Sequence, residues 1–198
     1  RTGSANVAIG FQALYDLNAG ADAYNVAVGF AAAENVSTGV RNVIMGGIAG
    51  NALTTGSYNV AIGYSALATE DAHGRNVAIG RNALYTLDAG ADAYNVAIGF
   101  YAGTAITTGP NNVIIGGLAA DALTTGSNNI AIGVGALGAE DGSSYNIAIG
   151  TNALQVQNAA ADAYNIAIGH NAGTAVSTGT NNVLIGGEAG DAITTGGE

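Results

Sequence analysis

The chain has 198 residues, a formal net charge of −10, 32 glycines, one proline and no cysteine. So few cations exclude partners that need clustered positive charge, such as nucleic acid and anionic membrane surfaces, and disulfides and thiolate sites are excluded as well. Periodic glycine with almost no proline argues against a disordered tract or collagen, and no apolar run approaches the ~18 residues that span a membrane.

A short motif of Asn, three mostly aliphatic residues and Gly repeats along the whole chain. Eleven copies begin at Asn6, Asn25, Asn42, Asn59, Asn76, Asn95, Asn112, Asn129, Asn146, Asn165 and Asn182. The spacing is 17 residues, widened to 19 after the first, fifth and ninth copies, so the pattern recurs every 70 residues. A repeat this short must stack on its neighbours to bury an apolar face. The sequence therefore predicts one all-β domain over residues 1–198, a parallel β-solenoid of eleven coils.

Each coil begins with a predicted strand, the first of which covers residues 6–9. Its alternation predicts that Val7 and Ile9 point inward and Ala8 outward. Gly10 ends the strand, and Ala13 and Leu17 begin columns that predict a second, closely spaced wall. Two short strands and two turns per coil describe a flattened, two-walled β-roll.

The Asn that opens every coil forms a column along the rod. Stacked ~4.8 Å apart, identical amides can donate and accept hydrogen bonds along the axis. The sequence predicts a structural Asn ladder made of the eleven residues that open the coils. A polar stripe that contacts a ligand is the alternative for the same column.

A second column follows from the expected outward direction of Ala8. Small apolar residues along ~50 Å of a rod are unusual on the exterior of a monomer, and they predict a self-association stripe with larger side chains every fourth coil. The stripe comprises Ala8, Ala27, Ile44, Ala61, Ala78, Ala97, Ile114, Ala131, Ala148, Ala167 and Leu184. A homotrimer is favoured over a dimer, and the alternative is that turns of the chain itself cover the stripe.

The three longer coils carry acidic loops at residues 16–22, 86–92 and 156–162. Their oxygens make weak candidates for Ca²⁺ ligands, namely Asp22, Asp92, Asp162, Asn18, Asp88 and Asn158. Capping of the expanded loops by Asx turns is the favoured alternative, and no other cofactor is expected. The pairs Glu70–Asp71 and Glu140–Asp141 are expected in solvated turns.

The sequence holds no recognisable catalytic constellation. Its two histidines, His73 and His170, lie at different places in their coils and are expected in turns, with no partner pattern for a metal or a triad. We therefore do not expect an enzyme. Because the chain begins and stops within the repeat, we expect part of a longer array, with end-to-end joining of rods as the alternative.

The motif, as at Asn59-Val60-Ala61-Ile62-Gly63-Tyr64, resembles the head repeats of trimeric autotransporter adhesins and the Asn-x-Ala-Ile-Gly repeats of phage tail-fibre-like proteins. The resemblance covers all eleven coils, although the coils here are longer than the adhesin repeat. It implies a parallel β-roll, left-handed and trimeric, displayed outside the cell, on the cell surface or on a virion.

Three functions follow in order of preference. The first is a non-enzymatic structural segment of an extracellular fibre, filament or adhesin that forms a stiff, self-associating rod. The second is an adhesin or tail-fibre tip whose repeated turns bind glycans or a surface with avidity. Ice binding comes last, because no strand column consists of Thr.

Overall fold

The computed structural model describes residues 3–196, which contain strands and turns and no helix long and apolar enough to cross a membrane. We number the coils 1 to 11 from the Asn that opens each, and position n is the residue n places after that Asn. The strands are β1 (Val7–Ile9), β2 (Val26–Val28), β3 (Val43–Met45), β4 (Val60–Ile62), β5 (Val77–Ile79), β6 (Val96–Ile98), β7 (Val113–Ile115), β8 (Ile130–Ile132), β9 (Ile147–Ile149), β10 (Ile166–Ile168) and β11 (Val183–Ile185).

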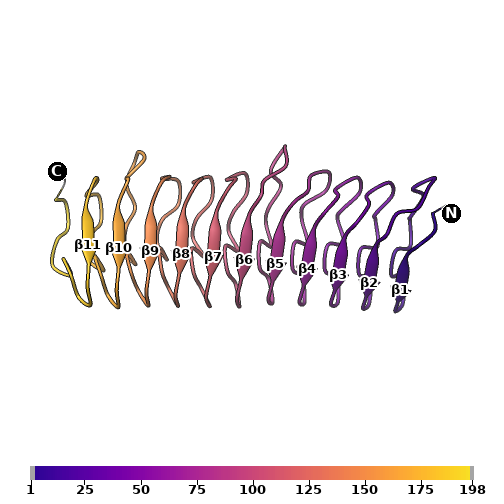
Figure 1. The fold of residues 1–198 in the computed structure, drawn as a ribbon, viewed down its shortest axis with the longest axis horizontal. Helices are drawn as coiled ribbons and strands as arrows, with labels where there is room; N and C mark the ends of the chain where they lie inside the picture. The colour runs from indigo at the N-terminus through magenta and orange to yellow at the C-terminus, as the bar shows by residue number, and fades with distance from the viewer. Residues whose placement is uncertain (1–2, 197–198) are drawn as a thin grey trace.

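The strands form one parallel sheet in chain order, and the coils stack side by side into an elongated rod (Figure 1). The predicted β-solenoid is confirmed. The register never slips: Val26 pairs with Val43 across a 17-residue separation, and Val77 pairs with Val96 across a 19-residue one. The two extra residues of coils 1, 5 and 9 are therefore absorbed in the acidic loops, which project from one edge of the rod (Figure 1).

The wall opposite the sheet consists of successive turns, and the second strand expected in each coil does not form within residues 3–196. Positions 6 and 8 of a coil have positive φ, for example 56° at Asn82 and 49° at Leu84. This alternation lets the wall bond to both neighbours: the Asn82 N–H donates to Tyr64 in the preceding coil, and the Leu84 N–H donates to Ala102 in the following one. These bonds offset the cost of left-handed backbone at non-glycine residues.

The expected direction of the strand side chains is wrong. The central residue of the strand points into the core, and the two flanking residues point outward. The column expected as a self-association stripe is therefore buried from coil 2 onward, at Ala27, Ile44, Ala61, Ala78, Ala97, Ile114, Ala131, Ala148, Ala167 and Leu184, with Ala8 alone exposed. The physical reason is the width of the interior: the Ala column at position 7 lies so close to the sheet that an Ala column opposite it fills the gap.

The 70-residue period also appears in the core, as a regular change in the sizes of the side chains at positions 2 and 8. Coils 1, 4, 5, 8 and 9 place Ala at position 2 of the strand and fill the remaining space with Leu at position 8, as at Ala78 and Leu84. Coils 3, 7 and 11 instead carry Ile or Leu at position 2, and position 8 shrinks to Gly or Ala there and in the preceding coil. At Gly50, for example, an added Cβ would lie 3.2 Å from Ile44 Cδ1.

Candidate functional site

The outer side of the sheet carries two continuous columns of aliphatic side chains, one at position 1 and one at position 3 of every coil. Two further columns border them, one at the residue before each Asn and one at position 5, which includes Arg81. We call these four columns the sheet face. The aliphatic columns are Val7, Val26, Val43, Val60, Val77, Val96, Val113, Ile130, Ile147, Ile166 and Val183, and Ile9, Val28, Met45, Ile62, Ile79, Ile98, Ile115, Ile132, Ile149, Ile168 and Ile185. All of them are half-buried or exposed. These side chains are β-branched apart from Met45, and they cover the rod from end to end.

A ladder of tyrosine and arginine borders one part of the sheet face, where the residue before the Asn alternates between Tyr and Arg from Tyr24 to Tyr94. The Arg41 guanidinium lies 5.9 Å from the Tyr24 ring centroid and 5.5 Å from that of Tyr58, and its Nη1 donates to the Tyr58 hydroxyl at 2.8 Å. Arg75 lies in the same way between Tyr58 and Tyr94, at 5.6 and 5.5 Å. Cation–π contacts thus connect five consecutive coils. The alternation of Tyr and Arg is visible in the sequence when the coils are aligned on this residue, but it was not among the predicted features.

The Asn column does connect the coils, through geometry that differs from the expected amide-to-amide ladder. Each Asn Oδ1 accepts the backbone N–H of the next Asn, as between Asn129 and Asn112 at 2.9 Å. Most of the Nδ2 groups instead donate to a turn carbonyl, as Asn129 does to Ser143 at 3.0 Å. Direct contacts between the amides of this column occur at Asn146 on Asn129 and at Asn182 on Asn165. Nine of these side chains are buried, from Asn25 through Asn165, so the column is structural where the structure places it.

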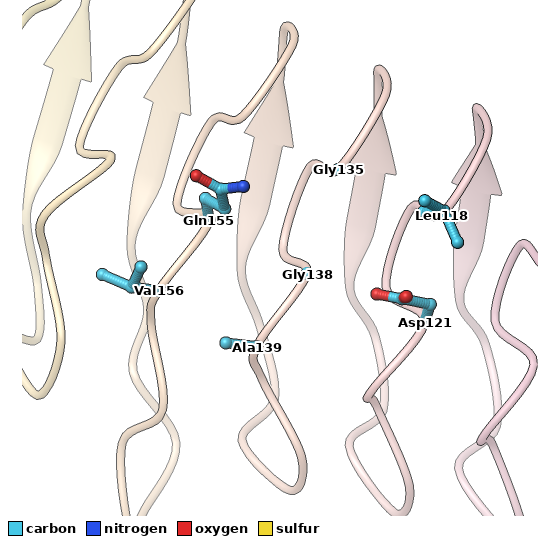
Figure 2. Close-up of a pocket in the computed structure, with 7 residues that line it drawn as sticks. All are labelled: Leu118, Asp121, Gly135, Gly138, Ala139, Gln155 and Val156. Atoms are coloured by element: carbon cyan, nitrogen blue, oxygen red, sulfur yellow. The ribbon is translucent and has the colours of Figure 1, made fainter.

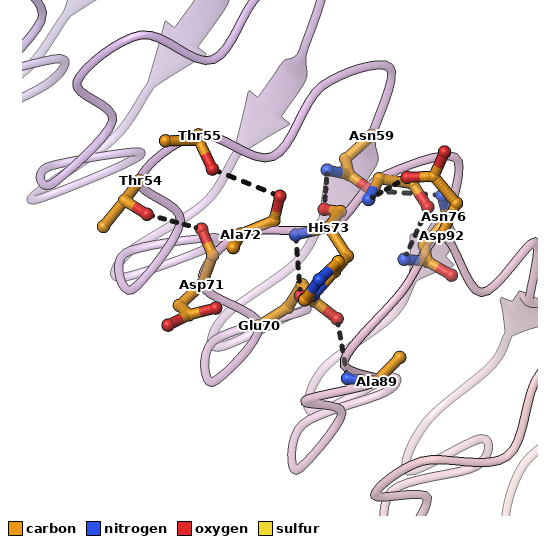
Figure 3. A network of polar contacts seen from close by, with 11 residues as sticks. Thr54, Thr55, Asn59, Glu70, Asp71, Ala72, His73, Asn76, Ala89 and Asp92 are labelled. Carbon is orange, nitrogen blue, oxygen red and sulfur yellow. Dashed lines mark hydrogen bonds and ion pairs between the residues drawn. The ribbon is translucent and has the colours of Figure 1, made fainter.

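Glu70 is fully buried, which contradicts the expected solvated turn. It occupies position 11, which is apolar in eight of the eleven coils. Glu70 accepts from the His73 N–H at 3.0 Å and the Ala89 N–H at 3.3 Å, and His73 Nδ1 lies 3.2 Å from Oε1 (Figure 3). Ligand atoms of Glu70, Asp71, His73 and Asp88 lie within 4.8 Å of one another. This group could hold one divalent cation.

Glu140 repeats the burial of Glu70 one 70-residue period later, with different partners. Gln157, which replaces the leucine found at this place in coil 5, donates to its Oε2 at 3.1 Å, and the Ser143 N–H donates to Oε1 at 2.8 Å. Ser143 and Asn158 stand where His73 and Asp88 stand. The cation-competent group is therefore not repeated in the described coils.

The remaining Ca²⁺ candidates either have hydrogen-bond or ion-pair partners or lie apart from one another on exposed loops. Asp22 accepts from the Ser4 and Tyr24 hydroxyls, and Asp92 accepts from the Gly74 N–H and pairs with Arg75. Asp162, Asn18 and Asn158 are exposed on their loops, and the backbone N–H groups of Asn18 and Asn158 donate to turn carbonyls of the next coil. Of the six candidates, the structure places only Asp88 in a group of potential ligands over residues 3–196.

A groove of about 450 Å³ crosses the turn wall at coil 8. It arises because coil 8 carries Gly135 and Gly138 where both neighbouring coils carry longer side chains, and Ala139 where coil 9 carries Val156. Its two sides come from coils 7 and 9, with Leu118, Asp121, Gln155 and Val156. Figure 2 shows the Asp121 carboxylate directed towards coil 8 from one side, and the nitrogen end of the Gln155 amide facing coil 8 from the other. Burial raises the pKa of the Asp121 carboxyl above its ordinary value, although a backbone hydrogen bond acts in the opposite direction.

No family model matches the chain, and neither a curated protein nor a solved structure is detectably similar to it.

Proposed function

We propose that the chain is a non-enzymatic structural segment of an extracellular fibre, filament or adhesin, and that it forms a stiff rod whose copies associate laterally through the sheet face. The observation that carries the proposal is the pair of uninterrupted aliphatic columns on the outer side of the sheet. A monomer rarely exposes a contiguous apolar patch of more than a few hundred Å². The two columns run without interruption through eleven coils, ~50 Å of the rod, and a partner would cover them.

The distribution of charge favours a second copy of the chain as that partner. The four outward columns of the sheet face contain Arg41, Arg75 and Arg81 and no Asp or Glu. Most of the carboxylates lie on the turn wall and its loops. Two copies that pack with their sheet faces together bury the apolar columns and keep the carboxylates of the two turn walls apart. Repulsion between chains of net charge −10 is therefore weaker in this arrangement than in one that brings the turn walls together.

Stiffness follows from the contacts between coils. The Asn column and the ladder of tyrosine and arginine each connect successive coils, on top of the backbone bonds of the sheet. A trimer is the arrangement we favour, because the motif resembles that of trimeric adhesin heads. A dimer and an end-to-end filament are the competing assemblies, and display outside the cell is part of the same proposal.

The test is the mass in solution, measured by light scattering after size-exclusion chromatography. The triple variant Ile62→Asp/Ile98→Asp/Ile132→Asp places three carboxylates on the sheet face, where buried charges would repel one another. We expect an oligomer for the unmodified chain and a folded monomer for this variant. A monomeric unmodified chain, or an unchanged oligomer in the variant, contradicts the proposal.

A matched control puts the same three charges on the opposite wall. Asn51→Asp/Thr104→Asp/Thr174→Asp changes position 9, where the chain itself carries Asp121 and Asp191. We expect this variant to keep the oligomeric mass. Loss of the oligomer in both variants would indicate a general effect of charge and would remove the sheet face from the proposal.

A further inference from the structure

The groove at coil 8 lies on the turn wall, away from the sheet face, so its role is separate from lateral association. We propose that this groove binds a neutral saccharide unit, held by the Asp121 carboxyl and the Gln155 amide over a floor of Gly135 and Gly138. Self-association is not required for this proposal, and failure of one leaves the other standing.

The floor of the groove is bare backbone. An added Cβ at Gly138 would lie 3.7 Å from Asp121 Oδ1. One at Gly135 would lie 2.9 Å from Asn152 Oδ1 and 3.9 Å from Gln155 Nε2. The space above the glycines is therefore bordered by Asp121 on one side and by the Asn152 and Gln155 amides on the other. A ligand that rests on this floor can meet a carboxylate on one side and an amide on the other without displacing a side chain of coil 8.

The lining selects the class of ligand. Asp121 offers acceptor oxygens, and Gln155 offers both a donor and an acceptor, which matches hydroxyl groups that donate and accept in turn. Leu118 and Val156 add aliphatic surface for the C–H groups of a pyranose ring. Sites of this size, mostly apolar with a few polar groups that fix orientation, are typical for small organic ligands.

The same lining disfavours other ligands. It contains no Lys, Arg or His, and the protein carries a net charge of −10, so a phosphate or carboxylate ligand lacks a counter-charge. A hard cation requires six or more oxygen ligands, whereas the groove supplies one carboxylate. No aromatic ring lines it that could stack with a planar ligand.

Coil 4 has larger side chains at the positions that form the floor of the groove in coil 8. Seventy residues earlier, coil 4 carries Ser65, Ala68 and Thr69 in place of Gly135, Gly138 and Ala139. Ser65 adopts a φ of 55°, close to the 64° of Gly135, so the backbone conformation is one that a serine already has in this fold. The Asn152 amide oxygen, 2.9 Å from the position of an added Cβ at Gly135, has to move, and Asn82 occupies the equivalent place beside Ser65. The variant Gly135→Ser/Gly138→Ala/Ala139→Thr fills the groove with residues that the fold already uses at the equivalent place.

The experiment follows backbone amide shifts by NMR while methyl α-D-mannopyranoside, methyl β-D-galactopyranoside and the methyl glycoside of N-acetylglucosamine are titrated. We expect saturable shifts at Gly135, Gly138 and Ala139 with at least one glycoside, and their loss in the filled variant. Asp121→Ala should weaken binding about tenfold, as expected for a lost hydrogen bond to a charged group. Asp191→Ala, which changes the same position in coil 11, should leave it unchanged.

Several results overturn the proposal. They are the absence of saturable shifts with all three glycosides, equal binding by the filled variant, and stronger shifts at the same amides with methylammonium chloride. Circular dichroism checks that the filled variant is folded. Should it not fold, the comparison of Asp121→Ala with Asp191→Ala decides, because equal affinity in these two variants also overturns the proposal.

Discussion

Gly103 and Ile114 share one volume of the core, since a Cβ on Gly103 would lie 2.9 Å from Ile114 Cδ1. The glycine belongs to the turn wall of coil 6 and the isoleucine to the strand of coil 7. Gly173 and Leu184 repeat this relationship one period later, at 2.8 Å. The 70-residue period therefore reflects which wall, the sheet or the turns, contributes the large side chain that fills the core in each coil.

Moving the large side chain from the strand to the turn wall, by Ile114→Ala combined with Gly103→Leu, should be tolerated better than either change alone. Ile114→Ala leaves a cavity and should cost about 3 kcal/mol, and Gly103→Leu alone should overpack the core. The double variant places Leu and Ala at the positions that Leu84 of coil 5 and Ala97 of coil 6 occupy one coil earlier, and it should cost less than the sum of the single changes. A double-mutant cycle from urea unfolding measures the coupling, and strictly additive costs would contradict it.

The glycine that ends each strand should resist substitution. Gly80 has a φ of 133°, and an added Cβ would lie 2.2 Å from the Gly99 carbonyl oxygen of the next coil. Gly80→Ala should destabilise the chain by roughly 3 kcal/mol or more, because strained backbone is combined with a backbone clash. The thermal unfolding midpoint is the measurement.

Gly90 provides the matched control for that change. It lies in a projecting loop, no atom lies within 4 Å of its added Cβ, and coil 9 carries Ala160 at the same place. Gly90→Ala should cost about 1 kcal/mol, the penalty of a left-handed alanine. Equal losses at Gly80 and Gly90 would refute the role assigned to the close approach of the coils.

The Asn column should contribute strongly to stability. Asn129→Ala removes the acceptor for the Asn146 N–H and the donor to the Ser143 carbonyl, both inside the rod. Two buried groups without partners should lower the free energy of unfolding by roughly 3 kcal/mol. Asn51→Ala, on the turn wall, should cost much less. Denaturant unfolding of both variants measures the difference, and equal costs would show that the buried amide contributes no more than a surface one.

The Asp121 carboxyl should impose a pH dependence on stability. Its pKa is raised in the folded chain, so the folded state holds its proton more tightly than the unfolded state does, and stability falls as pH rises from the unfolded pKa through the folded one. Asp121→Asn, which copies Asn51 of coil 3, should remove this fall. The free energy of unfolding at pH 3 and at pH 6 is compared in both proteins, and parallel pH profiles would contradict the prediction.

Periodicity alone was sufficient to predict the solenoid, the strand at each motif and the place of the loops. It was not sufficient to assign the inner and outer sides of the strand, because Val7 and Ile9 are as suitable for a core as for an interface between chains. The deciding information was the width of the interior. The Ala column at position 7 and the exchange between Ile44 and Gly50 both indicate it, and both can be read from the sequence.

The details of the candidate sites depended on geometry that a single sequence does not carry. Glu70 was expected in solvent because carboxylates rarely occupy a core position. Its burial becomes acceptable only when the backbone donors of His73 and Ala89 are seen beside it. The groove at coil 8 likewise arises from three small residues whose neighbours come from other coils.

Because the register is constant across coils of unequal length, the length of the rod depends on the number of coils and not on the number of residues in each. Two residues added in the loops at 16–22, 86–92 and 156–162 leave each strand paired with the next as before. Distance along the axis is thus counted in coils, and extra sequence at these loops extends sideways at intervals of four coils. Such a loop is a natural point for inserting a peptide or a small domain, displayed at regular spacing on an otherwise unaltered scaffold.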